Sequence, residues 1–493
     1  MRYKRLGFLL AAAGVLLFFA NAMGQDSFAE FRRGILGGFQ SYRDSLREEY
    51  DKFLDGAWSN YVSFRGENRT PIPKPRHVPR ADTVRVSHPL PPQDIPVVDV
   101  PDNAGENVEI EPATKPTPDD WAPNLDQTVS FDFYCFRPCV PEIGLESDKE
   151  LFSLDSPGAV WRRFKECDVV GKIVPGLRYF AETHCLSDWF YVELVRAYVD
   201  QVFVNAGSVI RVLLTQYLLL NSGFDVRLGV EEDGTPMLLI AIEQLVFARS
   251  FAEIGGTRYY IFHDSYDMEE KSNASARFRS CDIPDGLNMG RPVDMVIHKQ
   301  MDIPVRPHKY EIGFGGIAIR GEVNENLVKM LYKYPQVPIA CYEQSVIDFD
   351  LRDDVVMQLK RQLSEITIEA TAVDKLLHFV QESFDYATDD EQHGFEKPYF
   401  FEEILYYPQC DCEDRSIFYS YLLWHVLGVE NLLIGFPGHE AVAVHLPVSI
   451  KGDGYLYDGK PFYISDPTYM GAPTGMCMDA FRDVTPTIDY HWH

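Results

Sequence analysis

Cys412 is the residue of this chain that is best placed to act as a nucleophile. It follows Asp411, a good helix-capping residue, and the helical pattern after it ends at Gly428, a common helix stop. In the first turn of a helix, the backbone N–H groups and the helix dipole favour the thiolate and lower the pKa of the thiol. The local sequence therefore predicts a reactive cysteine at position 412.

A base and an acid follow this cysteine at equal intervals. His439 comes 27 residues after Cys412 and opens an alternating, strand-like pattern. Asp466 comes a further 27 residues on, at the end of a second strand pattern. In such a relay the imidazole takes the thiol proton, and the carboxylate fixes its tautomer and stabilises the imidazolium. The order helix, strand, strand predicts a Cys/His/Asp triad.

Two neighbouring residues offer alternatives to this triad. Cys410 precedes the helix cap, and His445 lies in the middle of a strand pattern, where a structural histidine is the simpler interpretation. A metal site of Cys410, Cys412, His439 and His445 is a third alternative, but it lacks the usual spacing of zinc ligands. We therefore predict that the protein uses neither a metal nor another cofactor.

An acyl-transfer reaction also needs donors for the oxyanion. The backbone N–H of Cys412 is the expected first donor, and Gln409 or Tyr407 is the expected second one. The sequence leaves the choice between these two open. Asp414, in the same short segment, is predicted to support the site.

Three short segments around these residues resemble the motifs of a known superfamily. They are Asp-Cys-Glu-Asp at 411–414, Gly-His at 438–439 and Asp-Pro-Thr at 466–468. They are similar to the three motifs of the transglutaminase-like superfamily of papain-type cysteine enzymes, over roughly residues 346–493. The resemblance implies an α+β fold, with helices packed on an antiparallel sheet, and the triad named above. Related domains act as peptidases, amidases or, less often, cross-linking acyltransferases.

An earlier block, residues 128–285, echoes the last one at an offset of 204 residues. In this alignment Ser208 takes the place of Cys412, and Thr235 and Asp264 take the places of the histidine and the acid. Without a histidine base the serine is not activated, so this copy is predicted to be inert. A chance match between apolar helices is the alternative, because many folds share such a pattern.

The elements that must position these residues follow from the hydrophobic periodicity. The predicted helices are 189–203, 208–220, 355–362, 372–384 and the segment after Asp411. The predicted strands are 237–242, 258–262, 294–299, 309–320 and 441–446. Residues 286–345 are predicted to be a strand-rich connection between the two copies.

The first 127 residues read as three consecutive segments. Residues 1–24 have a basic start, an apolar run and a small-residue cleavage site, as in a secretory signal peptide. The alternative is an uncleaved anchor, but the apolar run is shorter than the roughly 20 residues that span a bilayer. Residues 25–64 predict an amphipathic helix, and 65–127 a proline-rich linker.

Composition sets the outer limits on function. The chain has 493 residues, 13% of them aromatic, and a net charge of −28. The apolar content excludes disorder throughout, and the acidity argues against nucleic-acid binding. No later segment is apolar for long enough to span a membrane. Nine cysteines, an odd number, leave at least one thiol free or paired between chains in an oxidising compartment.

These observations predict a secreted or periplasmic cysteine enzyme. It would cleave or transfer peptide or amide acyl groups through a thioester on Cys412. Its partner would be a peptide or protein substrate, and helix 25–64 could self-associate or contact an envelope partner. The rival prediction is a non-catalytic cell-envelope scaffold whose domains bind other proteins.

Overall fold

The computed structural model describes residues 128–145, 148–151, 157–231, 235–262, 278–280, 290–367 and 369–493. The signal peptide, the amphipathic helix and the linker predicted for residues 1–127 lie outside the described residues, and so does Asp264. Among the described helices, none combines the length and the apolarity needed to cross a membrane.

Four helices form the base of the first lobe, residues 128–262 with 278–280. A short hairpin of β1 (Thr128–Ser130) and β2 (Cys139–Pro141) precedes them. The helices are α3 (Pro157–Glu166), α4 (Val169–Thr183), α5 (Asp188–Val202) and α6 (Ser208–Asn221). Helix α6 is apolar on nearly every face, and ten of its residues are buried. A helix of this kind belongs in the centre of a lobe.

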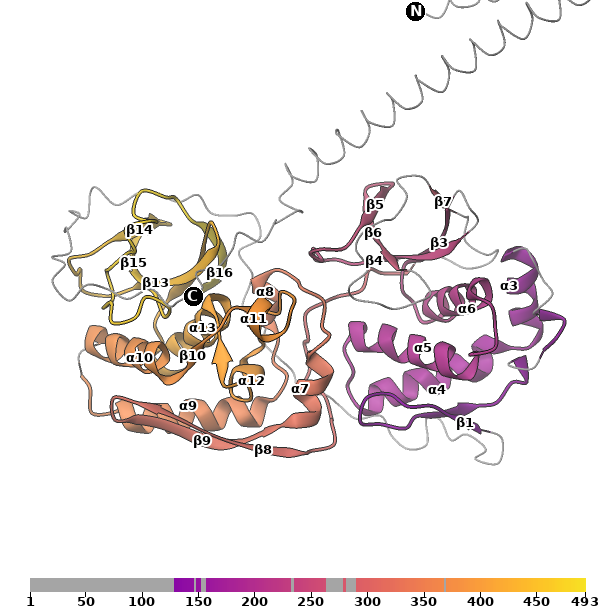
Figure 1. Cartoon of the computed structure of the whole chain (residues 1–493), viewed down its shortest axis with the longest axis horizontal. Helices are drawn as coiled ribbons and strands as arrows, with labels where there is room; N and C mark the ends of the chain where they lie inside the picture. Colours follow the sequence, from indigo (N-terminus) through magenta and orange to yellow (C-terminus); the bar gives the residue numbers. More distant parts are fainter. Residues whose placement is uncertain are drawn as a thin grey trace, which may run out of the picture. The chain divides into compact units, whose positions relative to one another are not determined.

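A five-stranded antiparallel sheet covers α6 in this lobe (Figure 1). Its order is β5-β6-β4-β3-β7. The strands are β3 (Val226–Glu231), β4 (Pro236–Ala241), β5 (Phe251–Ile254), β6 (Thr257–Phe262) and β7 (Phe278–Ser280). Every residue of β4 is buried, because α6 packs on one face and a small apolar cluster around Met237 and Tyr259 forms on the other.

The bridging segment, residues 290–348, contacts elements of both lobes. It contains a hairpin and two short helices, β8 (Pro307–Phe314), β9 (Ile317–Asn324), α7 (Glu325–Leu331) and α8 (Ile339–Gln344). Tyr334 illustrates the contacts, since its ring lies 5.8 Å from that of Phe190 and 5.2 Å from that of Phe400. Its hydroxyl also donates to the carbonyl of Met295. The segment is therefore part of the packed core.

The second lobe, residues 349–493, begins with two long helices and ends with a sheet. Its helices are α9 (Phe349–Leu363), α10 (Glu369–Ser383), α11 (Asp389–Gln392), α12 (Phe401–Ile404) and α13 (Cys412–Leu422), followed by a π-helical turn, η5 (Leu423–Leu427). Two short strands, β10 (Asp385–Tyr386) and β11 (Gln409–Cys410), pair in parallel beside α13. Gly428 ends the η5 turn with a φ of 68°, so the predicted helix stop is confirmed.

The sheet of the second lobe is also antiparallel and has five strands. It runs β14-β15-β13-β12-β16 and consists of β12 (Asn431–Phe436), β13 (His439–His445), β14 (Gly454–Tyr457), β15 (Lys460–Ser465) and β16 (Thr487–Trp492). Its strand order matches that of the first sheet position for position. In each lobe the central helix before the sheet, α6 or α13, packs against the two strands that follow it.

Most of the predicted elements are confirmed, but the strand predicted at 309–320 is divided by a turn into β8 and β9, and the one predicted at 294–299 is wrong. The helices predicted at 189–203, 208–220, 355–362 and 372–384 are α5, α6, α9 and α10. The strand predicted at 294–299 does not exist. This backbone is held by isolated hydrogen bonds, such as Met295 N–H to Gln244 Oε1 and Ile297 N–H to Ser345 Oγ. Its three consecutive apolar residues, Met295, Val296 and Ile297, are buried without pairing in a sheet.

Candidate active site

Cys412 is the first residue of α13, with Asp411 as the N-cap. The carboxylate of Asp414 fixes this turn, because its Oδ2 accepts the N–H of Asp411 at 3.0 Å and its Oδ1 accepts the N–H of Tyr399 at 2.7 Å. Both aspartates are buried. The predicted start of the helix and the supporting position of Asp414 thus follow from one local network.

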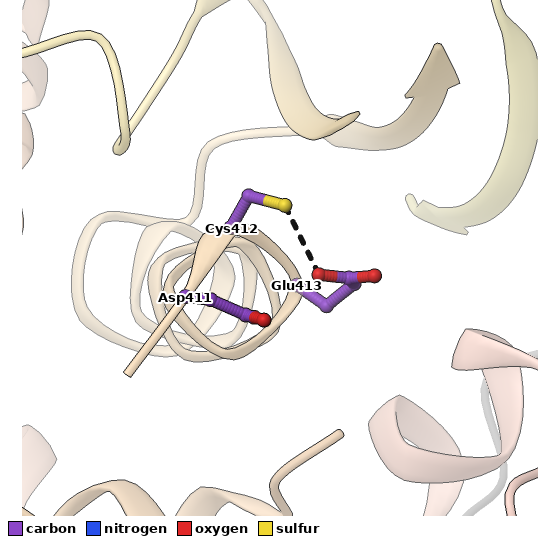
Figure 2. Close-up of side chains that lie close together, drawn as sticks. All are labelled: Asp411, Cys412 and Glu413. Atoms are coloured by element: carbon purple, nitrogen blue, oxygen red, sulfur yellow. Dashed lines mark hydrogen bonds between the residues drawn. The ribbon is translucent and has the colours of Figure 1, made fainter. Parts of the chain in front are cut away.

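The thiol of Cys412 donates to the adjacent side chain of Glu413. Sγ lies 3.0 Å from Oε2 (Figure 2). In this view the side chains of Cys412 and Glu413 converge, and the carboxylate of Asp411 lies beside them. Cys412 itself is fully buried. A carboxylate beside sulfur favours the S–H form over the thiolate, because the two negative charges repel each other. The carboxylate of Glu413 therefore opposes the helix start, which favours the thiolate of Cys412.

His439 and Asp466 form a close, buried pair. Nε2 of the imidazole lies 2.8 Å from Oδ2 of the carboxylate. His439 is the first residue of β13, and Asp466 directly follows β15. These strands are antiparallel, with Val442 opposite Ser465, so the start of one and the end of the other meet at the same sheet edge. With Nε2 directed at Asp466, Nδ1 is the ring nitrogen that remains to accept a proton.

The surroundings restrict both members of this pair. The imidazole of His439 stacks on the ring of Phe481, with 5.2 Å between centroids and 4° between planes. The other carboxylate oxygen of Asp466 accepts the N–H groups of Thr468, at 2.8 Å, and Tyr469, at 3.1 Å. The pair is therefore oriented by packing on one side and by backbone donors on the other.

Two hydrogen bonds attach α13 to the strands that carry this pair. Ser416, one turn after Cys412, donates its hydroxyl to the carbonyl of Glu440, the neighbour of His439, at 3.1 Å. Farther along α13, the hydroxyl of Tyr419 lies 2.8 Å from Oγ of Ser465. The first half of α13 is thus attached to β13, which begins at His439, and α13 also reaches β15, which Asp466 follows.

The residues predicted to assist the oxyanion lie on the segment before α13. Gln409 is in the short strand β11, opposite Asp385. Tyr407 packs into an aromatic cluster, with its ring 5.0 Å from that of Tyr399 and 5.3 Å from that of His393. This cluster gives the Tyr407 side chain a packing role. The backbone N–H of Cys412, at a helix start, remains the best-placed donor.

The two alternative residues have structural roles. Cys410 is buried in the core, and burial raises the pKa of its thiol to about 12, so it stays protonated at neutral pH. It accepts a hydrogen bond from Nε of Arg415. His445 ends β13 instead of lying in its middle, and its Nδ1 contacts the carbonyl oxygen of Pro461 at 2.9 Å. Cys410 and Cys412 do not form a disulfide with each other.

Acidic side chains converge at the start of α13. Within the described residues, ligand atoms of Asp411, Cys412 and Glu413 lie within 4.8 Å of one another, and so do those of Asp389, Asp411 and Asp414. Carboxylates are ligands that hard cations accept. The metal site considered from the sequence, with Cys410 and two histidines, is not one of these groups.

Gln381 is a buried residue that the sequence reasoning missed. Its Nε2 lies 2.9–3.0 Å from the carbonyl oxygens of Asp466, Tyr469 and Ala472. Its Oε1 accepts the N–H of Gly471. The side chain thus holds the loop that begins with the predicted acid. The available signal was a glutamine on the apolar face of the helix predicted at 372–384.

Comparison of the chain with protein-family models found no match, and comparison with curated proteins found none either.

Proposed function

We propose that this protein is an exported cysteine acyl-transfer enzyme that cleaves peptide or amide bonds, with Cys412, His439 and Asp466 as its triad. The observation that carries the proposal is the 2.8 Å contact between Nε2 of His439 and Oδ2 of Asp466, beside strands to which α13 is hydrogen-bonded. Nucleophile, base and acid then come from a helix start, a strand start and a strand end, as the sequence motifs predict.

The reaction would proceed through a thioester. Nδ1 of His439 takes the proton of the Cys412 thiol, and sulfur attacks the carbonyl carbon of the substrate. The backbone N–H of Cys412 donates to the oxyanion that forms. As the C–N bond breaks, the imidazolium returns the proton to the leaving amine. Water, activated by the same imidazole, then hydrolyses the thioester and releases the acid. Water is the most abundant acceptor outside the cell, which favours hydrolysis over cross-linking.

We further propose that the two lobes are copies of one transglutaminase-like fold. The identical strand order of the two sheets supports this, together with the start of α6 at Ser208, 204 residues before Cys412. Thr235, just before β4, then corresponds to His439, the first residue of β13. With a hydroxyl in place of the imidazole, the first lobe would have no base and no peptidase activity of its own.

Peptide profiling tests the proposal directly. Wild-type protein and the Cys412→Ala variant are incubated with peptide and peptidoglycan-fragment libraries, and the products are identified by mass spectrometry. We expect cleavage to be lost in Cys412→Ala and kept in Cys410→Ala. We also expect trapped samples of the wild type to carry an acyl adduct on Cys412. Cleavage that survives Cys412→Ala, or no cleavage by wild-type protein, would overturn it.

The second candidate function is a non-catalytic scaffold of the cell envelope that uses both lobes to bind proteins. The observation that favours it is the state of Cys412, whose thiol is buried and donates to Glu413. A nucleophile must meet its substrate, so the enzyme requires this thiol to become accessible. Alkylation by iodoacetamide across pH separates the two functions. If the protein is an enzyme, Cys412 should react faster than a model thiol. If it is a scaffold, Cys412 should be protected from alkylation.

A further inference from the structure

A cleft of about 760 Å³ opens in the first lobe, between the end of α4, the start of α5 and residues 291–299 of the bridging segment. Its size is within the range of small-molecule sites, roughly 300–1,000 Å³. The bridging segment is fixed there by backbone hydrogen bonds, among them Arg291 N–H to the carbonyl of Gly223 and Asp225 N–H to the carbonyl of Arg291. The cleft therefore has walls from well-separated parts of the sequence.

This cleft is distinct from the position that corresponds to Cys412. It is lined by Ser222, Gly223 and Phe224, which directly follow α6, whereas Ser208 begins that helix. A helix of 14 residues separates its two ends by about 20 Å. The cleft is thus a separate feature of the first lobe.

The floor of the cleft is apolar, with one hydroxyl pair. Ala181, Phe224 and Val296 are buried there, and the ring of Tyr191 lies 5.7 Å from that of Phe224. The hydroxyl of Tyr191 contacts Oγ of Ser222 at 2.6 Å. An apolar floor of this kind accommodates a short aliphatic or aromatic group.

The rim of the cleft carries charges of both signs. Two pairs are already formed, Arg291 with Asp188 and His298 with Asp294, the latter at 2.7 Å. Asp294 and its hydrogen bond also raise the pKa of His298, which favours the charged form of the pair.

Four further charged side chains line the same cleft. They are the cations Arg178 and Lys299 and the anions Glu182 and Glu243. All four are exposed, and among the described residues none of them takes part in an ion pair. Two cations and two anions therefore remain available to a ligand, beside a floor that is apolar.

We propose that this cleft binds a short peptide with free termini, whose carboxylate meets one of the cations, Arg178 or Lys299, and whose ammonium group meets one of the anions, Glu182 or Glu243. An apolar side chain of the peptide would cover the floor formed by Phe224 and Tyr191. Available charges of both signs select a zwitterion over a purely acidic or purely basic molecule. The first lobe is then a peptide-binding module, and this role does not depend on whether Cys412 is catalytic.

Calorimetric titration of the full chain tests this site. The protein carries Cys412→Ala, which prevents cleavage, and the probes are the tripeptide Ala-Leu-Ala, its N-acetylated form and its C-amidated form. Saturable binding of Ala-Leu-Ala with a Kd below about 1 mM is expected. Each blocked form should bind about tenfold more weakly, because it lacks one charge-assisted hydrogen bond.

Charge reversal then assigns the ends of the peptide. In Arg178→Glu/Lys299→Glu, the preference for the free carboxylate over the amide should disappear, while the preference for the free amine remains. Lys172→Glu, on the same helix but outside the cleft, is the matched control and should bind as the parent does. These exposed positions can change sign without disturbing the core. No saturable binding, equal binding of the blocked forms, or a carboxylate preference that persists in the double variant would each overturn the proposal.

Discussion

Sγ of Cys412 lies 3.0 Å from Oε2 of Glu413, its neighbour on α13, and the thiol donates this hydrogen bond. The candidate nucleophile is therefore held by a carboxylate that favours its protonated form, while the helix start favours the thiolate. The balance between these two influences decides how reactive the cysteine is.

Replacing this carboxylate should activate the thiol. Glu413→Gln removes the negative charge and keeps the size of the side chain, so we expect Cys412 to be alkylated by iodoacetamide about three- to tenfold faster at pH 7. Mass spectrometry of the labelled peptide separates Cys412 from the other cysteines. Glu391→Gln, at an exposed position, is the control. A rate that is unchanged or lower in Glu413→Gln would show that the carboxylate does not restrain the thiol.

Asp466 should control the tautomer of His439. Asp466→Asn keeps the shape of the side chain but no longer requires the proton on Nε2, so peptide cleavage should fall by about two to four orders of magnitude. The measurement is kcat/KM on the peptide found by profiling. His445→Gln, at the other end of β13, should leave this value within about twofold. Equal effects of the two substitutions would contradict a special role for Asp466.

The amide of Gln381 should stabilise the loop that follows β15. Gln381→Glu replaces a donor that lies within 3.0 Å of three carbonyl oxygens by a carboxylate that repels them. We expect the free energy of unfolding to fall by about 2–4 kcal/mol, as measured by urea denaturation. Glu382→Gln, the next residue on α10, is the control. A loss below about 0.5 kcal/mol would mean that the loop does not depend on this amide.

Glu343 should make stability depend on pH. It is fully buried, and desolvation raises its pKa from 4.5 to about 8, although Trp492 donates a hydrogen bond to it. Between these values the folded protein keeps a proton that the unfolded chain loses. Stability therefore decreases as the pH rises through this window, by up to about 1.4 kcal/mol per pH unit from this group.

The Glu343→Gln variant isolates this effect. It should be more stable than wild type at pH 8 by a few kcal/mol, and the difference should shrink as the pH approaches 5. Urea denaturation across this range measures it, with the exposed Glu365→Gln as the control. If the stabilities of Glu343→Gln and wild type change in parallel with pH, the carboxyl of Glu343 does not titrate in this way.

The sequence alone predicted the local elements of the second lobe well. Asp411 and Gly428 limit a helical segment because capping and a left-handed C-cap are properties of the residues themselves. Alternation of apolar and polar residues likewise identified the strand that begins near His439, since a strand of an antiparallel sheet alternates its faces. The spacing of the three candidate residues also follows from the sequence without any coordinates.

Tertiary structure decided which side chains meet. The prediction of a strand at 294–299 was wrong because side chains such as Gln244 and Ser345 can accept the hydrogen bonds of a buried backbone. The hydrophobic pattern does not distinguish such a segment from a strand paired in a sheet. The contact of His439 with Asp466 depends on the register of β13 against β15. The hydrogen bonds of Gln381 to the loop after β15 depend on how α10 packs. Registers and packing are long-range, so only the folded chain fixes them.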